Sequence, residues 1–470
     1  MTAATAYSDA IGTDAEGHLR VEEIEARELA ERFGTPLFVI SERQIRTNVA
    51  RWREAFGSRY PRSRILFATK ANTNAAVRRI FTLAGAGGDV FGPGELYVTL
   101  SAGTDPRLVV LNGFSKRDEE LRMAIEAGVT IHLDAPSELD DVARLARELG
   151  LRARVGIRTR LLLHALDDLQ SDWPPGISAG EGARTMNKFG VGADDVDEMV
   201  GRALAADEIE MAGLHHHVGR WAPDRRLHDA VVREQLALAA RLRDRHGWVP
   251  EYFDFGGGMA FGRAEGHGPL GHDRGLPTCE DYAETITAAF AEELERHDLG
   301  SPELFVEPGR ALASDIGVLL TRVGVRKRFA DTDPEQTWIG VDASQNLLLN
   351  TLSGGFYYHP VAVDRPADQE VETVNVGDPL CWFGNLAMSC RLPRLDRGDL
   401  LAFLDTGAYC ESKSLQFNAR PRAGCVLVSG DRAEVITEAE SLQDVLRRFR
   451  VPARLWAEAV PGHEALSAAP

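Results

Sequence analysis

The sequence predicts a mixed α/β protein, in which a closed (β/α)8 barrel of the TIM type is followed by a C-terminal β-rich domain that also takes the N-terminal segment. Three observations lead there. The 470 residues exceed what one hydrophobic core usually supports. From Arg64 onward, short β-type runs alternate with amphipathic helical stretches. After Arg310 that alternation stops, and short runs separated by Gly, Pro and Asp take its place.

The alternating region contains eight candidate strands, and a repeated strand-helix order implies a parallel sheet. Eight units over about 250 residues fit a closed barrel better than an open doubly wound sheet, which usually has fewer strands. The candidate strands are Ile65–Thr69, Asp89–Phe91, Leu108–Leu111, Thr130–Leu133, Arg154–Arg158, Met211–His215, Tyr252–Phe255 and Leu304–Val306. The helical stretches between them include Ala75–Leu83, Glu119–Ala127, Ser137–Leu149, Asp195–Ala206, Leu227–Arg245 and Glu280–Arg296.

Three regions are expected along the chain: 1–45, 46–312 and 313–470. The first holds a strand-like run, Leu37–Ile40, which we expect to join the C-terminal sheet before a helix over Glu42–Phe56. The second is the barrel. The third holds the β runs Gly317–Val323, Thr337–Val341, Leu400–Leu404 and Gly424–Val428, with helical periodicity returning only at Leu442–Phe449.

Composition excludes several classes of protein. The net charge of -18 disfavours binding to nucleic acid or to an anionic membrane, which leaves small molecules as the expected partners. The five cysteines have no CxxC spacing, so neither a disulfide framework nor a zinc site is indicated, and we expect no metal. No secretion signal opens the chain and no long apolar run crosses it, so the expected compartment is the cytoplasm.

Reactive side chains fall where the barrel strands are expected to end, which is where barrels of this type build their active sites. Lys70 ends the first strand, although a lysine there is also common as a solvated surface group. The sixth strand ends in His215-His216-His217, and alternation puts the first and third on one side. A buried structural histidine or a metal pair is the alternative, but no further metal ligands have a telling spacing.

The last two strands end in groups suited to a phosphorylated ligand. Gly256, Gly257 and Gly258 follow the seventh strand, where successive backbone N–H groups can cradle a phosphate, although glycine runs also form plain turns. Glu307 and Arg310 follow the eighth, with a structural salt bridge as the alternative. A lysine, a histidine, a glycine turn and an acid at one rim match what pyridoxal 5'-phosphate requires.

Nearly the whole chain, from about Pro36 to Leu446, resembles the pyridoxal-phosphate enzymes of fold type III, the alanine-racemase-like barrels, and among them the diaminopimelate and ornithine decarboxylase group. The segments that carry the resemblance are Phe67–Asn72, Gly88–Leu96, Asn187–Val191, Gly213–Gly219, Asp254–Gly258, Glu307–Arg310, Cys381, Gly407–Tyr409 and Asn418–Pro421.

The resemblance implies a role for each matching residue. Lys70 corresponds to the Schiff-base lysine, Asp89 to its polar neighbour, His217 to the residue stacked on the cofactor, and Glu307 to the partner of the pyridine nitrogen. An acid at that nitrogen favours decarboxylation over racemisation. The implied phosphate contacts are Gly256, Gly257, Gly258, Arg310 and Tyr409.

Cys381 corresponds to a residue that protonates the product from the second subunit, so the resemblance also implies a homodimer with active sites at the subunit interface.

The substrate pocket departs from the diaminopimelate decarboxylase pattern. An ungapped alignment from Asp342 puts Asn350 at the position of an arginine and Gly354 at that of a tyrosine, and Trp382 replaces an acid after Cys381. These losses predict that diaminopimelate is disfavoured. Arg220 replaces a serine, and either contacts the phosphate, grips an anionic substrate or is a solvated surface group. The candidate substrate contacts are Arg220, Asp342, Asn350 and Trp382.

The function expected from these observations is pyridoxal-phosphate-dependent decarboxylation of an amino acid or of a modified or carrier-linked relative, in a specialised pathway such as siderophore or natural-product assembly. Three alternatives stay open. They are diaminopimelate decarboxylase with a rearranged pocket, an amino-acid racemase, and a non-catalytic carrier of the cofactor.

Overall fold

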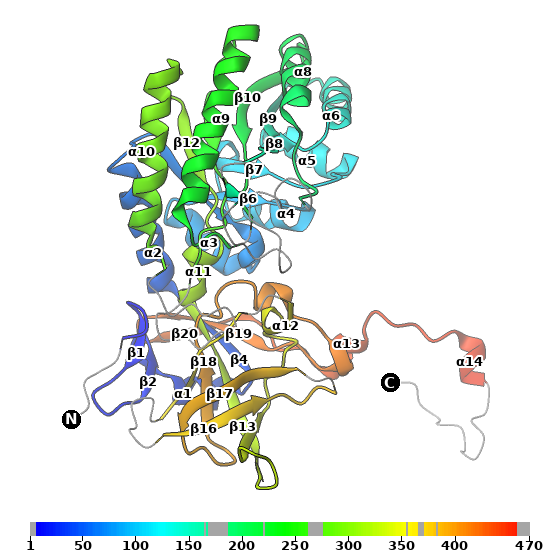
Figure 1. Ribbon diagram of the computed structural model, residues 1–470. Helices are drawn as coiled ribbons and strands as arrows, with labels where there is room; N and C mark the ends of the chain where they lie inside the picture. Colours follow the sequence, from blue (N-terminus) through cyan, green and yellow to red (C-terminus); the bar gives the residue numbers. More distant parts are fainter. Residues whose placement is uncertain are drawn as a thin grey trace.

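The computed structural model describes residues 6–163, 166–167, 187–219, 221–261, 276–353, 356–364, 371–381 and 384–457. Figure 1 shows two layers of the molecule: a barrel surrounded by helices lies on a β-rich domain, and the chain after α13 (Leu442–Leu446) extends away from both toward α14 (Ala453–Ala457). No helix in these described ranges is long and apolar enough to cross a membrane.

Eight parallel strands close into the barrel, because the last of them pairs with the first. In chain order they are β5 (Ser63–Ala68), β6 (Gly87–Val90), β7 (Val109–Leu111), β8 (Thr130–Leu133), β9 (Ala153–Arg158), β10 (Ile209–His215), β11 (Tyr252–Asp254) and β12 (Glu303–Val306). Each overlaps one strand predicted from the sequence. The predicted barrel is therefore confirmed.

The barrel interior is filled by side chains rather than open. One inner cluster contains Leu66, Val110, Ala212, Tyr252 and Phe305, one residue from each of five strands, all buried. Two glycines make room for the largest member: a Cβ on Gly213 would lie 2.5 Å from the Tyr252 ring, and one on Gly156 would meet its hydroxyl. Because this buried cluster fills the barrel below the rim, functional groups lie at the strand ends.

Helices cover the outside of the barrel as the 3.6-residue periodicity predicts. They are α2 (Glu42–Gly57), α3 (Ala75–Leu83), α4 (Pro93–Ser101), α5 (Asp118–Ala127), α6 (Pro136–Leu149), α8 (Ala193–Leu204), α9 (Arg225–His246) and α10 (Cys279–His297). Helix α4 is not among the helical stretches named from the sequence. Pro93 occupies its first helical turn, where its fixed φ favours the helix and no N–H is needed.

The β domain is one nine-stranded sheet in which β4 (Leu37–Ser41) lies between β13 (Gly317–Phe329) and β19 (Gly424–Ser429). The predicted entry of the N-terminal segment into this domain is thereby confirmed. The other strands are β14 (Gln336–Val341), β15 (Pro360–Ala362), β16 (Val371–Gly377), β17 (Asn385–Pro393), β18 (Leu400–Phe403) and β20 (Arg432–Thr437). A small sheet, β1 (Ile11–Thr13) to β2 (Leu19–Val21) to β3 (Ile24–Glu25), and α1 (Ala26–Phe33) precede it.

Short elements connect the two layers at the site. The 3-10 turn η1 (Thr69–Ala71) follows β5, and α11 (Arg310–Ala313) and η4 (Ser314–Ile316) lead from β12 into β13. On the β-domain side lie α12 (Asn350–Ser353), η5 (Glu411–Lys413) and η6 (Phe417–Ala419). Backbone bonds fix this contact: the N–H of Tyr409 donates to Ala71 O at 2.7 Å.

Candidate active site

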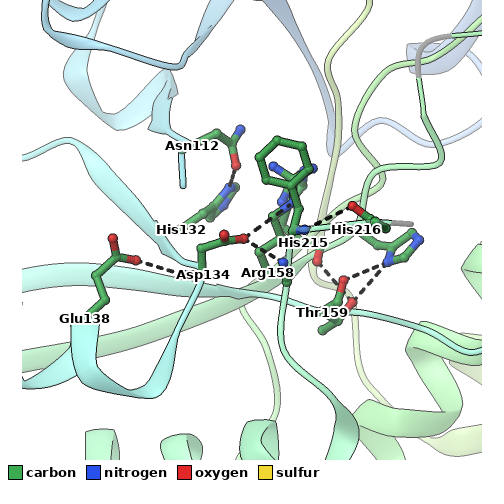
Figure 2. A network of polar contacts seen from close by, with 12 residues as sticks. Asn112, His132, Asp134, Glu138, Arg158, Thr159, His215 and His216 are labelled. Atoms are coloured by element: carbon green, nitrogen blue, oxygen red, sulfur yellow. Dashed lines mark hydrogen bonds and ion pairs between the residues drawn. The ribbon is translucent and has the colours of Figure 1, made fainter. Parts of the chain in front are cut away.

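A polar or charged side chain stands at the end of every barrel strand. We call these eight residues the rim ring: Lys70, Asp89, Asn112, His132, Arg158, His215, Asp254 and Glu307. Each comes from a different strand or from the residues directly after it, and all but Lys70 are buried. Since the carboxyl ends of parallel strands meet at one rim, these groups converge. Figure 2 shows part of the ring, with Asn112 turned toward His132. The rings of His132 and His215 stack with their centres 4.6 Å apart.

Lys70 and Asp89 form an ion pair at the rim. The Lys70 side chain is 32% exposed whereas that of Asp89 is wholly buried, so the amine is the accessible member. Burial alone would lower the pKa of Lys70, but the charge of Asp89, with Tyr409 and Glu307 farther away, raises it. Burial and Glu307 also raise the pKa of Asp89. The raised pKa of Lys70 keeps the proton on the amine, and Asp89 is the adjacent group that can take this proton when the amine reacts.

Glu307 lies at the base of the ring, 3% exposed. Its Oε2 is 3.4 Å from His215 Nε2, and Asn112 Nδ2 donates to its Oε1 at 2.7 Å. Its neighbour Asp254 has its pKa raised well above the usual range, by burial first and by Glu307 second. Asp254 Oδ1 also accepts the N–H of Gly256 at 2.8 Å, which ties the acid cluster to the glycine turn.

The glycine turn after β11 lies against His217. Gly257 N–H donates to His217 Nδ1 at 3.0 Å, and burial lowers the pKa of this histidine well below its usual value, so the imidazole is neutral with its proton on Nε2. Gly256 and Gly258 adopt φ of 63° and 87°, which favour glycine. A Cβ on Gly256 would come within 2.7 Å of His217 Nδ1, so the turn has no room for side chains.

Arg310 and Tyr409 complete the cluster on the side facing the β domain. The Arg310 guanidinium lies 4.8 Å from the centre of the Tyr409 ring and 3.7 Å from that of Phe356. Within the described ranges, its buried Nε has no hydrogen-bond partner. A buried donor that is fixed between two rings and left unpaired is suited to an anion.

Four members of the ring were missed in the sequence: Asn112, His132, Arg158 and Asp254. Asn112 directly follows a strand and His132 lies within one, and neither belongs to a recognisable sequence motif. Arg158 ends β9 and lies 3.9 Å from Asp134, with its guanidinium 4.3 Å from the centre of the Phe189 ring. These residues could have been found with the rule that identified Lys70 as a candidate. That rule looks for a polar residue where a barrel strand ends, and it could have been applied to all eight strands.

The four ring residues His132, His215, Asp254 and Glu307 place one ligating atom each within 4.8 Å of one another. Both ring nitrogens of His132 are already engaged, Nδ1 with Asn112 Oδ1 and Nε2 with the Tyr252 hydroxyl, each at 2.9 Å. The set therefore matches a hydrogen-bonded network better than a tetrahedral ion site.

The residues present fit pyridoxal phosphate. Lys70 offers an accessible amine, His217 a neutral flat ring, and Glu307 a buried acid. The tight glycine turn and the unpaired Nε of Arg310 suit its phosphate. This combination on a closed parallel barrel defines a class of protein, the pyridoxal-phosphate enzymes built on an alanine-racemase-like barrel.

The comparisons with known proteins agree. The family model for the pyridoxal binding domain of pyridoxal-dependent decarboxylases matches residues 42–314. The chain belongs to this family, and it is a carboxy-lyase that acts on an amino acid with pyridoxal phosphate as cofactor.

Its relatives match over nearly their full length. The diaminopimelate decarboxylase of Methanothermobacter thermautotrophicus is 37% identical and the match covers 93% of this chain and 97% of that protein; that of Archaeoglobus fulgidus is 34% identical, with 93% and 98% covered. A crystal structure of diaminopimelate decarboxylase from M. jannaschii, also solved with L-lysine, has a TM-score of 0.85 at 29% identity and covers 95% of this chain and 99% of that one.

These relatives contradict one expectation. The prediction that diaminopimelate is disfavoured, with a specialised substrate in its place, was wrong, because near-full-length relatives carry the name diaminopimelate decarboxylase. That prediction assumed that an asparagine in place of the arginine, at Asn350, removes the positive charge from this part of the site. In the structure, Lys413 Nζ donates to Asn350 Oδ1 at 2.8 Å, so a cation from a distant segment stands beside that position.

The remaining candidate residues lie apart from the ring or outside the description. Asp342 accepts from Thr35 and Thr321 hydroxyls, both at 2.6 Å, which braces the β domain, and its contact with substrate stays a prediction. Cys381 is exposed, with Asn418 Nδ2 3.4 Å from its Sγ. Arg220 and Trp382 lie outside the described residues.

Proposed function

We propose that this chain removes CO2 from diaminopimelate and releases lysine, with pyridoxal phosphate held on Lys70. The observation that carries the substrate is the near-full-length similarity to enzymes named diaminopimelate decarboxylase. The cation at Asn350 supports it, since diaminopimelate carries a second carboxylate at its far end, whereas ornithine and lysine carry an ammonium group.

Each group of the site receives a proposed role. Glu307 binds the protonated pyridine nitrogen, His217 stacks on the ring, and Arg310, Tyr409 and the glycine turn hold the phosphate. Bound pyridoxal phosphate supplies a sink for the electron pair released when the carboxylate leaves. Asp89 receives the proton that Lys70 Nζ must lose before this amine reacts, which their ion pair and the raised pKa of Asp89 support.

Lys413 is the proposed contact for the distal carboxylate. Its partner Asn350 is 4% exposed, and Asn350 Nδ2 donates to Tyr409 O at 3.2 Å and to the Tyr358 hydroxyl at 3.0 Å. The neighbouring Ser412 hydroxyl donates to Lys70 O at 3.1 Å. These bonds hold the segment that carries Lys413 against the backbone of the reactive lysine. An ammonium there attracts a carboxylate and repels a diamine precursor.

The substrate assignment is tested with purified holoenzyme and the stereoisomers of diaminopimelate, lysine, ornithine and arginine. The assay measures CO2 release, the product by mass spectrometry and the chirality of unreacted substrate. We expect CO2 and lysine from diaminopimelate alone. Loss of chirality without CO2 release would indicate a racemase, and no reaction with any of the compounds would indicate a carrier of the cofactor. CO2 release from a different amino acid only would show that this amino acid, and not diaminopimelate, is the substrate.

We further propose a homodimer in which Cys381 of the partner subunit returns a proton to the product carbon. The support is local: Cys381 is exposed on the β domain, away from the ring of its own chain in every contact described for it. Mixing the Lys70→Ala and Cys381→Ala variants under exchange tests this. Random reassociation should restore about a quarter of the wild-type activity, because half of the dimers then have one intact site. No recovery from mixed dimers would disprove the shared site.

Two coarser proposals accompany these. We propose domain limits of 1–45, 46–312 and 313–470. Helix α2 crosses the first of these limits, so limited proteolysis is the test of where the chain divides. We also propose the cytoplasm as the compartment, in keeping with five free cysteines. Fractionation of cells that express a tagged chain tests the second.

A further inference from the structure

Asn112, directly after β7, uses every polar atom of its side chain inside the rim ring. Its Nδ2 donates to Asp89 Oδ1 at 2.8 Å and to Glu307 Oε1 at 2.7 Å, and its Oδ1 lies 2.9 Å from His132 Nδ1. Asn112 is 1% exposed, so water does not compete for these bonds. One neutral amide therefore joins the acid beside Lys70 to the acid at the base of the site.

The chemistry of the neighbours fixes the orientation of the amide. Ionised carboxylates only accept hydrogen bonds, so the NH2 group, with two hydrogens, must face Asp89 and Glu307. The carbonyl then faces His132, whose Nδ1 must donate, while its Nε2 accepts from the Tyr252 hydroxyl at 2.9 Å. His132 can do so only as a neutral imidazole, and burial followed by the nearby His215 lowers its pKa well below the usual value.

The Asn112 amide also lies between two acidic side chains that repel each other. Glu307 raises the pKa of buried Asp89, so the two acids repel each other through the ring. A donor between them gives each acid one hydrogen bond that favours its ionised form. The hydrogen bond from Asn112 acts in the opposite direction and lowers the pKa of Asp89. Without that donor, the pKa of Asp89 would rise further, and Lys70 would lose its ionised counter-ion at a higher pH.

We propose that Asn112 is a positioning residue that holds Asp89 and Glu307 in one hydrogen-bonded unit, and so keeps Asp89 ionised as the counter-ion of the reactive lysine while it fixes the acid that binds the cofactor ring. The inference rests on the proposed roles of Lys70 and Glu307. It predicts that removing the two hydrogens of this amide changes where the lysine-bound cofactor titrates, even if the cofactor still binds.

The test uses Asn112→Asp holoenzyme, which preserves shape and replaces the donor with a fourth acid in the rim ring. The readout is the visible absorption band of the lysine-bound cofactor, titrated from pH 6 to 10, together with kcat and KM for diaminopimelate. The titratable groups that face Asn112 are those of the rim ring and Tyr252. Because added negative charge favours protonated forms, we expect the midpoint of the band to rise by about one pH unit or more.

The kinetic constants should separate. We expect kcat to fall about 100-fold, the scale of a displaced proton-transfer group, while KM changes less than about threefold, because Asn112 touches no part of the distal pocket. Asn112→Ser, which keeps one donor, should lie between the wild type and Asn112→Asp in both midpoint and kcat. It also serves as the informative variant if the aspartate variant does not fold.

Asn375→Asp is the matched control. Asn375 is a buried asparagine of β16, 7% exposed, whose Oδ1 accepts from Ser389 N–H at 2.9 Å, far from the ring in sequence and sheet. For the Asn375→Asp variant, the titration midpoint of the cofactor absorption band and kcat should equal those of the wild type. An unchanged midpoint in both Asn112 variants would overturn the proposal. Failure of wild-type enzyme to release CO2 from diaminopimelate would instead overturn the proposed substrate, and the spectral test would still stand.

Discussion

The barrel rim and the β-domain side of the site are built in opposite ways. The rim ring takes one polar residue from each of eight strands of a closed sheet or from the residues directly after it, and every member except Lys70 is buried. Asn112 bonds to two of the others, Asp89 and Glu307. On the other side, Tyr409, Asn350 and Lys413 come from short turns and helices, joined by bonds to backbone atoms and to one another. The rim is thus suited to a fixed chemical step, and the loops to variation in substrate.

This contrast teaches where sequence comparison can be trusted. Strand ends cannot shift without breaking the barrel, so a residue matched at the rim keeps its position in space. A loop position can lie beside a charge from another segment, as Lys413 beside Asn350 shows. The error about diaminopimelate arose because a loop position was read with the confidence appropriate to a strand end.

The largest expected effect belongs to the rim. Lys70→Ala should abolish the visible band of the lysine-bound cofactor and lower kcat on the order of 10⁴-fold, because no other described ring member offers an accessible amine. Absorption spectra of reconstituted protein and CO2 assays measure both. Lys327→Ala, an exposed lysine of β13, is the control and should match the wild type in both. A retained band in Lys70→Ala would mean that another amine holds the cofactor.

An intermediate effect should come from the β-domain side. Lys413→Met should lower kcat/KM for diaminopimelate by about tenfold to 150-fold, the value of one charge-assisted contact of about 1.5–3 kcal/mol. The fall should appear chiefly in KM, and the cofactor band should not change. Lys327→Met provides a matched loss of a lysine elsewhere in the domain. An unaltered KM would remove Lys413 from the distal pocket and leave the rim assignments intact.

Acid should weaken the barrel through its buried histidines. Burial lowers the pKa of His228, in α9, to about 4, whereas in the unfolded chain it is near 6.5. Between those values the unfolded state binds more protons, so the free energy of unfolding falls as the pH drops from about 6.5 to 4. The expected slope is about 1.4 kcal/mol per pH unit for this histidine.

Denaturant unfolding of the holoenzyme at several values in that pH range measures this slope. His228→Gln, which has no titrating ring, should reduce it by about that amount. His216 has a pKa lowered to about 4 by the same burial, so part of the slope should remain in the variant. Identical slopes in the two proteins would show that His228 is protonated in the folded state.

Much of the fold and part of the site could be predicted before any coordinates. Each predicted barrel strand overlaps an observed one. Lys70, His217, the glycine turn and Glu307 were proposed as site residues because a polar residue at a barrel strand end has a known direction. Asn112 was missed, since a single asparagine after a short strand carries no motif. Helix α4 was also not named from the sequence; it begins at Pro93, within a segment whose interest was its resemblance to a known family.

The sequence by itself determined the barrel, its joining to a β domain and the set of strand ends that face one rim, because hydrophobic periodicity and strand order are local properties. Only the tertiary structure decided which polar groups bond across that rim. Asn112 is 195 positions from Glu307 in the chain, and Lys413 is 63 from Asn350. Hydrogen bonds act over about 3 Å of space whatever the separation along the chain, so partners of this kind become known only when the chain is folded.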